Sequence, residues 1–269
     1  MGEAIKVGVL GAAGRMGRML LRLASQARGL ELVGGADRAG SADLDHDLGE
    51  LAGVGGLGLA LLDDPAPLFG LANVLIDFTQ PAASVRHAHL AAETGRALVI
   101  GTTGLEPEQQ AAVAAAARRT AILQAANMSL GVNLLLLLVE QVAARLDPGY
   151  DIEVLEMHHR MKVDAPSGTA LALGRAAAAG RGRPLDELWV KSRDGITGRR
   201  EAGPIGFATL RGGDVVGEHS VIFAGPGERL ELTHKAGSRE LFAQGALRAA
   251  RWLAGKPPGL YSMRDVLGL

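Results

Sequence analysis

The densest set of chemically active side chains lies in residues 156–171, whose sequence is EMHHRMKVDAPSGTAL. A strand-like run ends there in two adjacent histidines, His158 and His159. Arg160 and Lys162 follow within a short loop. Side chains of these types can donate hydrogen bonds to an acidic ligand or transfer protons. A histidine alone is more often an ordinary surface or core residue, so the interpretation depends on the whole cluster.

The same segment continues into a predicted helix rich in Ala and Leu. Ser167 is a good N-cap for this helix, and Gly168 lets an anion approach the N–H groups of the first turn. Cationic and donor groups beside a helix N-terminus favour a ligand that carries carboxylates. The histidine pair also resembles part of a metal site, but no carboxylate or cysteine is spaced to complete the ligands. We therefore expect no metal here.

A glycine-spaced turn lies between a predicted strand at residues 4–10 and a predicted helix. The turn consists of Gly11, Ala12, Ala13, Gly14, Arg15, Met16 and Gly17. Such a turn lets backbone N–H groups reach a pyrophosphate at the positive end of the helix dipole. This spacing alone is weak evidence, because a plain tight turn has it too. Asp37, which stands 20 positions after Gly17 at the end of the next predicted strand, strengthens the prediction of a dinucleotide site.

Neighbouring residues give opposite indications about the nicotinamide cofactor. Asp37 would accept hydrogen bonds from the adenosine ribose hydroxyls, which favours NADH. Arg38 and Arg15 would pair with a 2′-phosphate, which favours NADPH, unless Arg38 is an ordinary solvated loop charge. We expect the protein to use NADH or NADPH.

Two more turns follow predicted strands. They consist of Gly101, Thr102 and Thr103, and of Ala125, Ala126, Asn127 and Met128. Ligands of open α/β sheets bind beyond the carboxyl ends of the strands, so these turns would line the nicotinamide and its ribose. The alternative is that they are ordinary strand-end turns.

The order of predicted elements indicates two domains. Strands and helices alternate up to about residue 124, which is typical of an α/β fold with a doubly wound parallel (Rossmann-like) sheet. Residues 39–57 are predicted to be a loop within it. A long apolar helix at 129–145 follows. The strands then lengthen, at 151–158, 205–210, 215–223 and 229–234, and predict a smaller α+β domain with an open mixed sheet. We expect a last helix at 239–253 to return to the first domain.

Composition excludes several classes of protein. The 269 residues have a formal net charge of −1, so no overall field attracts nucleic acid or an acidic membrane. The chain has no cysteine, which excludes disulfides, thiolate zinc sites and a thiohemiacetal mechanism. The most apolar run, Leu134 to Val139, is far shorter than a membrane span, and the first residues lack the apolar core of a signal peptide. We expect a cytoplasmic protein without nucleic-acid or membrane partners.

Seven segments carry a resemblance to the 4-hydroxy-tetrahydrodipicolinate reductase (dihydrodipicolinate reductase) family. They are GAAGRMGR (11–18), VLIDFTQP (74–81), VIGTTG (99–104), AANMSLGVN (125–133), EMHHRMKVDAPSGTAL (156–171), GFATLRGGDVVGEH (206–219) and LTHKAGSR (232–239). They follow the order of the family through nearly the whole chain. The segment at 156–171 is long enough to be highly specific.

The resemblance implies an enzyme of the diaminopimelate route to lysine, an oxidoreductase that reduces a small dicarboxylate with NADH or NADPH. It implies a dinucleotide-binding domain of residues 1–129 and 240–269, a substrate-binding and oligomerisation domain of residues 130–239, and a homotetramer. His158 would be the catalytic donor and acceptor, and Lys162 the proton donor. The implied substrate contacts are His159, Gly168 and Thr169. The implied cofactor contacts are the residues from Gly11 to Met16, Asp37, Arg38, Gly101 to Thr103 and Ala125 to Met128.

The chain departs from the family at three positions, two of which are implied cofactor contacts. Many relatives have Glu at the position of Asp37, Arg at that of Gln80 and Phe at that of Met128.

Two other functions remain open, namely another two-domain NAD(P)-dependent dehydrogenase and a non-catalytic nucleotide-binding sensor. The missing cysteine removes semialdehyde dehydrogenases from the first class. The presence of both His158 and Lys162 disfavours the second.

Overall fold

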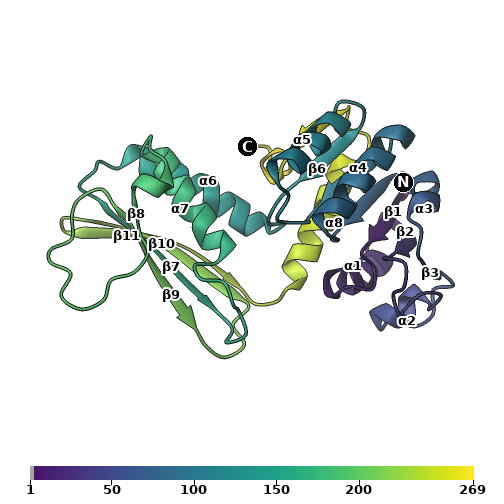
Figure 1. Cartoon of the computed structure of the whole chain (residues 1–269), viewed down its shortest axis with the longest axis horizontal. Helices are drawn as coiled ribbons and strands as arrows, with labels where there is room; N and C mark the ends of the chain where they lie inside the picture. Colours follow the sequence, from purple (N-terminus) through teal and green to yellow (C-terminus); the bar gives the residue numbers. More distant parts are fainter. Residues whose placement is uncertain (1–2) are drawn as a thin grey trace. The chain divides into compact units, whose positions relative to one another are not determined.

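The computed structural model describes residues 3–269, which divide into two compact units. Unit 1 contains the chain up to Ser129 together with Glu240–Leu269, and unit 2 contains Leu130–Arg239 (Figure 1).

Unit 1 is built on a parallel sheet. In the part of the chain that the structure describes, its seven strands lie in the order β12-β6-β5-β4-β1-β2-β3. The strands are β1 (Ile5–Leu10), β2 (Leu30–Ala36), β3 (Leu61–Leu62), β4 (Val74–Asp77), β5 (Ala97–Ile100), β6 (Ala121–Gln124) and β12 (Gly259–Tyr261). The strand order runs outward from β1 in both directions, so the topological switch point lies between β1 and β4. The predicted doubly wound fold is confirmed.

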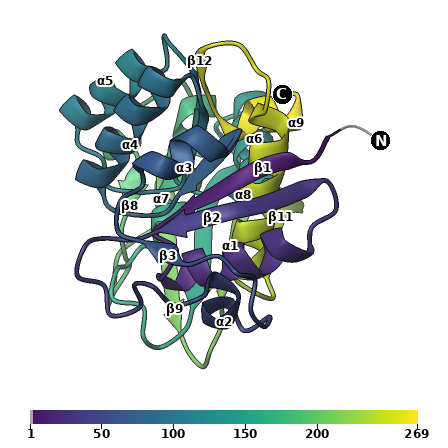
Figure 2. The same cartoon turned by 90° about the vertical axis from the view of Figure 1, so that its right-hand side faces the viewer.

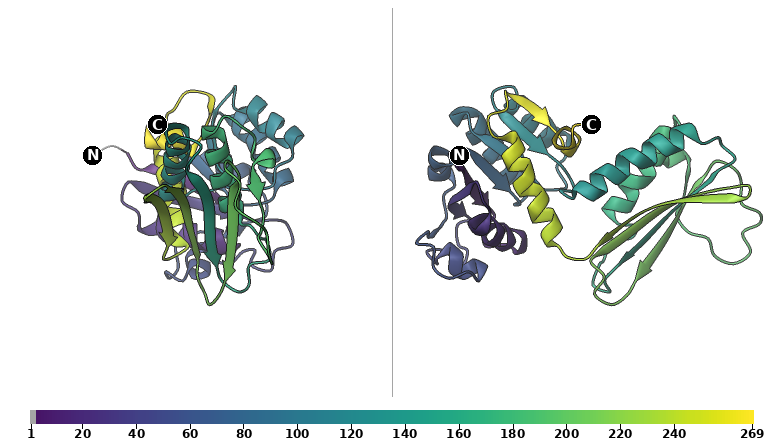
Figure 3. Two further views of the ribbon diagram at one scale, coloured as in Figure 1. Left: turned by 90° about the vertical axis from the view of Figure 1, so that its left-hand side faces the viewer. Right: turned by 180° about the vertical axis from the view of Figure 1, so that it is seen from behind.

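Helices cover both faces of this sheet. They are α1 (Arg15–Gln26), α2 (Leu48–Ala52), α3 (Ala66–Leu71), α4 (Pro81–Thr94), α5 (Pro107–Ala116), α8 (Glu240–Leu253) and α9 (Met263–Leu267). Helices α4 and α5 pack together on one face, whereas α1 and α8 lie side by side on the other (Figures 1 and 3). The central strands β4 and β5 are therefore fully buried. Burial on both faces explains why these strands are apolar runs without alternation, apart from Asp77 at the end of β4.

Unit 2 has a mixed sheet covered on one face by two helices. Its strands lie in the order β11-β10-β7-β9-β8, with β11 and β7 antiparallel to β10, and β9 parallel to β7 and β8. The elements are α6 (Leu130–Arg145), β7 (Asp151–His158), α7 (Gly168–Gly180), a 3₁₀ turn (Leu185–Glu187), β8 (Trp189–Val190), β9 (Ile205–Arg211), β10 (Gly217–Gly225) and β11 (Glu228–Ala236). Helices α6 and α7 lie along the same face of the sheet (Figures 1 and 3). The predicted open mixed sheet is confirmed.

Strand β7 alternates strictly between half-buried and buried residues. Ile152, Val154, Glu156 and His158 are the buried set. Because alternate side chains of a strand point to the same face, two polar residues continue the apolar stripe that packs under the helices. The end of β7 therefore carries a carboxylate and an imidazole into the helix-covered side of the unit.

The prediction of a loop at residues 39–57 is wrong, because the segment contains α2. The Asp47 side chain caps this helix by accepting hydrogen bonds from the N–H groups of Gly49 and Glu50. It also accepts from Leu57 and Gly58. The hydrogen bond from Leu57, with those from the helix, holds the pKa of Asp47 below its usual value. A five-residue helix is too short to show a periodicity, which is why the sequence pattern missed it.

None of the helices in residues 3–269 is long and apolar enough to cross a membrane.

Figure 2 shows unit 1 from the side where β1 and β2 run next to each other, with their carboxyl ends pointing the same way.

Candidate functional site

The carboxyl ends of the strands of unit 1 are level with one another. Leu10, the last residue of β1, pairs with Ala36 of β2 and with Asp77 of β4. Ile100 of β5 pairs with Asp77 and with Gln124 of β6. The turns that follow these strands therefore open at one edge of the sheet. The structure brings together the sequence-predicted cofactor residues of all four turns.

The glycine-rich turn packs closely against β4. Gly11 has a φ of +78°, and a Cβ there would lie 2.7 Å from the carbonyl oxygen of Phe78. A Cβ at Gly17 would overlap the carbonyl oxygen of Gly11. Gly14 is the N-cap of α1, and no side chain caps this helix. The start of α1 thus presents backbone rather than side chains, as a phosphate-binding turn requires.

Asp37 joins the end of β2 to this turn. One carboxylate oxygen accepts a hydrogen bond from the N–H of Ala13 at 2.9 Å, and the other accepts from the N–H of Arg38 at 2.8 Å. Arg15 and Arg38 are both exposed. The Asp37 carboxylate therefore contacts the glycine-rich turn directly. Arg15 lies in the same glycine-rich segment of the sequence, and Arg38 follows Asp37.

A buried carboxylate that sequence reasoning missed connects the next two turns. Asp77 is fully buried and accepts hydrogen bonds from the N–H and the hydroxyl of Thr79, at 2.9 and 2.6 Å. It also bonds His87 Nδ1 of α4 at 2.9 Å and the hydroxyl of Thr102 at 3.3 Å. The hydroxyl of Thr102 is thus used inside the protein, whereas Thr103 is exposed. The signal in the sequence that could have identified Asp77 is its place as an acidic residue at the end of an apolar strand.

The last of the predicted turns lies against the C-terminal helix α8. Met128 is buried, and a Cβ at Gly245 of α8 would overlap its carbonyl oxygen. Asn127 accepts a hydrogen bond from the N–H of Ser129 at 2.9 Å. The glycine in α8 is what allows the helix to approach the end of β6 this closely.

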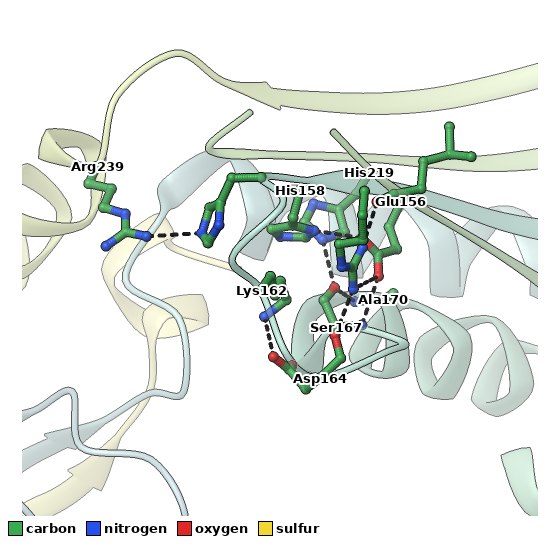
Figure 4. A network of polar contacts seen from close by, with 11 residues as sticks. Glu156, His158, Lys162, Asp164, Ser167, Ala170, His219 and Arg239 are labelled. Carbon is green, nitrogen blue, oxygen red and sulfur yellow. Dashed lines mark hydrogen bonds and ion pairs between the residues drawn. The ribbon is translucent and has the colours of Figure 1, made fainter. Parts of the chain in front are cut away.

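The residues predicted to act on the substrate lie around the end of β7 in unit 2 (Figure 4). The centre of their network is Glu156, which is 1% exposed. Its Oε2 accepts from His158 Nδ1 at 2.6 Å, and its Oε1 accepts from the N–H of Ser167 at 3.0 Å. Arg211 donates to both oxygens, at 2.8 and 3.0 Å. Burial acts to raise the pKa of Glu156, but the hydrogen bonds from Arg211 and His158 outweigh it and hold the pKa below its usual value.

The register of the sheet explains how distant residues join this network. His219 of β10 pairs with Glu156, and Arg211 of β9 pairs with His158. Directly opposed residues of neighbouring strands point to the same face. Sequence reasoning assigned no role to Glu156, Arg211 or His219, because nothing in the local pattern shows which strands are neighbours.

The start of α7 is held in the same network. The predicted N-cap is confirmed, since the hydroxyl of Ser167 accepts from the N–H of Ala170 at 3.1 Å. His219 Nε2 lies 3.0 Å from the same hydroxyl. A Cβ at Gly168 would meet no atom within 4 Å, so the chain leaves space beside the first turn of α7. Thr169 follows within this turn.

Lys162 and His159 lie in the loop that joins β7 to α7, and His159 is the first residue of this loop. Lys162 Nζ contacts Asp164 Oδ1 at 2.8 Å, and the hydrogen bond from Lys162 lowers the pKa of Asp164 (Figure 4). His159 Nε2 lies 3.2 Å from the guanidinium of Arg239. Because a guanidinium can only donate, this nitrogen of His159 must be the acceptor. The loop before α7 thus carries Lys162 and His159, and Arg239 contacts it through His159.

Comparisons with known proteins show the family of this chain. The family model for the N-terminal part of dihydrodipicolinate reductase matches residues 5–128, and the model for its C-terminal part matches residues 131–267. The chain belongs to the dihydrodipicolinate reductase family. It is 57% identical to 4-hydroxy-tetrahydrodipicolinate reductase 1 of Mesorhizobium japonicum over 100% of both chains. It is also 57% identical to 4-hydroxy-tetrahydrodipicolinate reductase of Brucella abortus, over 97% of this chain and 98% of that one.

Solved structures share the fold. Dipicolinate-bound dihydrodipicolinate reductase from Paenisporosarcina superimposes with a TM-score of 0.78 at 24% identity, covering 97% of this chain and 98% of that chain. An amine dehydrogenase from Mycobacterium smegmatis reaches a TM-score of 0.61 at 16% identity, over 96% and 95% of the two chains. Identities this low support the fold alone.

We predict that His219 makes the protein less stable in acid. Burial first, and then the neighbouring His158, lower the pKa of His219 from 6.5 to about 4. Below pH 6.5 the unfolded chain binds a proton at this residue that the folded chain does not bind until about pH 4. Acidification from pH 7 to pH 5 therefore lowers the free energy of unfolding, by an amount on the order of 1 kcal/mol.

The measurement is denaturant unfolding at pH 7 and pH 5, for the wild type and for His219→Gln. The variant should lose less stability between the two pH values, whatever its stability at pH 7. His89→Gln, at an exposed position on α4, is the matched control and should lose as much as the wild type. An equal loss in His219→Gln and the wild type would contradict the prediction.

Proposed function

We propose that this protein reduces 4-hydroxy-tetrahydrodipicolinate to tetrahydrodipicolinate with NADH or NADPH, formally with loss of the 4-hydroxyl group as water, in the diaminopimelate route to lysine. The observation that carries the proposal is the site at the end of β7, where His158, Lys162 and the open first turn of α7 occur together in a chain of this family. Relatives that are 57% identical over the whole chain bear the name of this activity. A site retained in this detail favours turnover over a sensor that only binds nucleotide.

The turns of unit 1 fit a nicotinamide dinucleotide. Its pyrophosphate would bind at the start of α1, where Gly14 leaves the helix without a side-chain cap. Each oxygen of the Asp37 carboxylate accepts one hydrogen bond from a backbone N–H. The remaining lone pairs would accept hydrogen bonds from the hydroxyls of the adenosine ribose. The exposed Thr103 would offer its hydroxyl at the nicotinamide end. The bound cofactor supplies the hydride.

The loop and helix of unit 2 fit a small dicarboxylate. One carboxylate would bind at Gly168 and Thr169, where the N–H groups of α7 and its dipole favour an anion. His159, which can donate through its other nitrogen, would bind the second polar group. Lys162 carries three donors on a flexible stem, and its contact with the exposed Asp164 is one that a bound anion can replace.

Lys162 and His158 would manage the proton. Reduction leaves electron density on the substrate, and an acid placed within hydrogen-bonding reach must protonate it. Lys162 donates this proton from Nζ, and its positive charge stabilises the negative charge that develops before the transfer. His158 accepts or donates a proton through Nε2, since its Nδ1 is held by Glu156.

The sharpest test of this assignment is Lys162→Met, which keeps much of the side-chain volume but removes the charge and all donors. General acid catalysis contributes about 10²- to 10⁴-fold, so kcat should fall at least about 100-fold. The affinity for NADH and NADPH should not change. The assay follows the loss of absorbance at 340 nm when substrate is generated by the synthase that precedes this step.

Lys191→Met is the matched control, since Lys191 is an exposed lysine of the same unit that lies over the Trp189 ring. It should keep normal kcat and KM. A Lys162→Met enzyme with normal kcat and a raised KM would make Lys162 a binding residue only. An inactive wild type would refute the proposed function itself.

We expect both cofactors to bind with affinities that differ by no more than about tenfold, roughly 1.4 kcal/mol. Asp37 favours the ribose hydroxyls of NADH, and the exposed Arg38 favours the 2′-phosphate of NADPH. Fluorescence titration with each cofactor measures the difference. Arg38→Ala should weaken NADPH while leaving NADH unchanged. A hundredfold preference in the wild type would contradict the expectation, and an Arg38→Ala variant that binds both cofactors as the wild type does would make Arg38 a solvated charge.

We propose that the protein is a homotetramer that associates through the sheet of unit 2. The face of this sheet opposite α6 and α7 carries Leu155, Met157, Leu210 and Ile222, and β11 is an edge strand with exposed residues along its length. Apolar sheet faces and open edges need cover. Light scattering at micromolar concentration should report four chains, and a purely monomeric protein would rule the proposal out.

A further inference from the structure

The contacts of Glu156 exceed what a structural ion pair requires. A buried carboxylate is satisfied by one bidentate arginine, and Arg211 supplies that contact. Glu156 accepts two further hydrogen bonds, one from the His158 ring and one from the backbone N–H of Ser167. These two donors belong to the two functional parts of the site, the proton-transfer histidine and the start of the anion-binding helix.

The first of these contacts determines where His158 carries its proton. An ionised carboxylate can only accept, so the nitrogen that faces it must be the donor. Nδ1 of His158 faces Glu156 at 2.6 Å and therefore keeps its hydrogen in every protonation state. In the neutral ring Nε2 is then the acceptor, because a neutral imidazole has one of each.

The surroundings of His158 leave that second nitrogen open. Nε2 makes no hydrogen bond to any residue of the described range 3–269. A Cβ at Gly217 would lie 2.9 Å from Nε2, so the glycine at the start of β10 keeps it uncovered. The ring itself is held by an edge-to-face contact with His219, with 5.0 Å between the ring centroids. The imidazole is thus fixed at one nitrogen and available at the other.

The second contact determines where α7 begins. The N–H of Ser167, donated to Glu156 Oε1 at 3.0 Å, immediately precedes the turn that contains Gly168 and Thr169. A helix N-terminus binds an anion only where its N–H groups point at a fixed place. The same carboxylate therefore sets the distance between the proton-transfer nitrogen and the N–H groups that would hold the substrate carboxylate.

We propose that Glu156 is a positioning residue for the reduction, which fixes the tautomer of His158 and joins that ring to the start of α7. This proposal rests on the proposed function for its kinetic consequences, but the tautomer can be tested without it. Glutamine cannot replace the carboxylate, because its NH₂ would face Arg211 in either orientation, together with either His158 or the N–H of Ser167. Of these donors only the imidazole can adapt, by accepting from the NH₂ at Nδ1, so Glu156→Gln should move the His158 proton to Nε2 without changing side-chain volume.

The kinetic test uses the full-length enzyme with single and double variants. Glu156→Gln should lower kcat at least about 10-fold, since an imidazole held in the wrong tautomer cannot transfer the proton. The affinity for NADH should be unchanged. In a His158→Gln background, Glu156→Gln should lower kcat by less than about threefold more, because residues that act as one unit are not additive.

Glu153→Gln is the matched control. Glu153 lies on the same strand and is also held by arginines, with Arg193 at 2.8 and 3.0 Å and Arg200 at 3.0 Å, but it faces away from the site. It should keep kcat within about twofold, as expected for an ion pair that stabilises only the fold. A full loss from Glu156→Gln in the His158→Gln background would overturn the positioning role and leave Glu156 as a structural residue.

The tautomer itself is read from the wild-type protein by nitrogen-15 NMR of the histidine rings. His158 is assigned by the signals that disappear in His158→Gln. A neutral ring protonated on Nδ1 is the expected result, and one protonated on Nε2 would overturn the proposal even if Glu156→Gln failed to fold. An active wild type with an Nε2-protonated His158 would refute the positioning role and leave the proposed function intact. An inactive wild type with an Nδ1-protonated His158 would refute the function and leave the local geometry intact.

Discussion

Burying the charge of Glu156 imposes a constraint that reaches across unit 2. An ionised carboxylate removed from water costs several kcal/mol unless close donors replace its hydration. Here four donors do so, from three different elements, and each must be in place at once. Strand β9 must lie in register beside β7 to bring Arg211, and α7 must begin where Ser167 can turn its N–H inward. The loop between β7 and α7, which carries Lys162, has little freedom as a result.

Unit 1 has the same arrangement in another chemical form. Asp77 ends β4 as Glu156 nearly ends β7, and it too is buried beneath residues that would contact a ligand. Its partners are two threonines and a histidine in place of an arginine. In both units a buried carboxylate at a strand end collects the backbone and side chains of neighbouring turns. Loops that carry function are otherwise the more mobile parts of a protein, so this anchoring gives them fixed geometry.

The histidines of unit 2 differ in what their surroundings permit. His158 has a carboxylate partner, whereas His219 is buried against a serine hydroxyl and a second imidazole, and its Nδ1 has no hydrogen-bond partner among residues 3–269. Burial first, and then the neighbouring His158, lower the pKa of His219 to about 4 against the opposing effect of the Glu156 charge, so this ring stays neutral beside the site. A neutral His219 adds no further positive charge beside His158, whose carboxylate partner already binds Arg211. Neighbouring residues of one type thus take different roles because of their partners.

The amino-acid sequence by itself determined the class of fold and the family, and it predicted the residues of a ligand site. These follow from local signals, which are the glycine spacing before α1, the acidic residue after β2, the strand and helix periods, and the serine that caps α7. Short elements escaped it, and α2 is the example, because its start depends on one carboxylate that also binds residues ten positions later. Only the tertiary structure decided which groups hold the site together. Arg211 is 55 residues from Glu156 and His219 is 52 residues from Ser167, and their meeting depends on strand order and register. Those are set by burial of the whole sheet against its helices, a property that no short stretch of sequence contains.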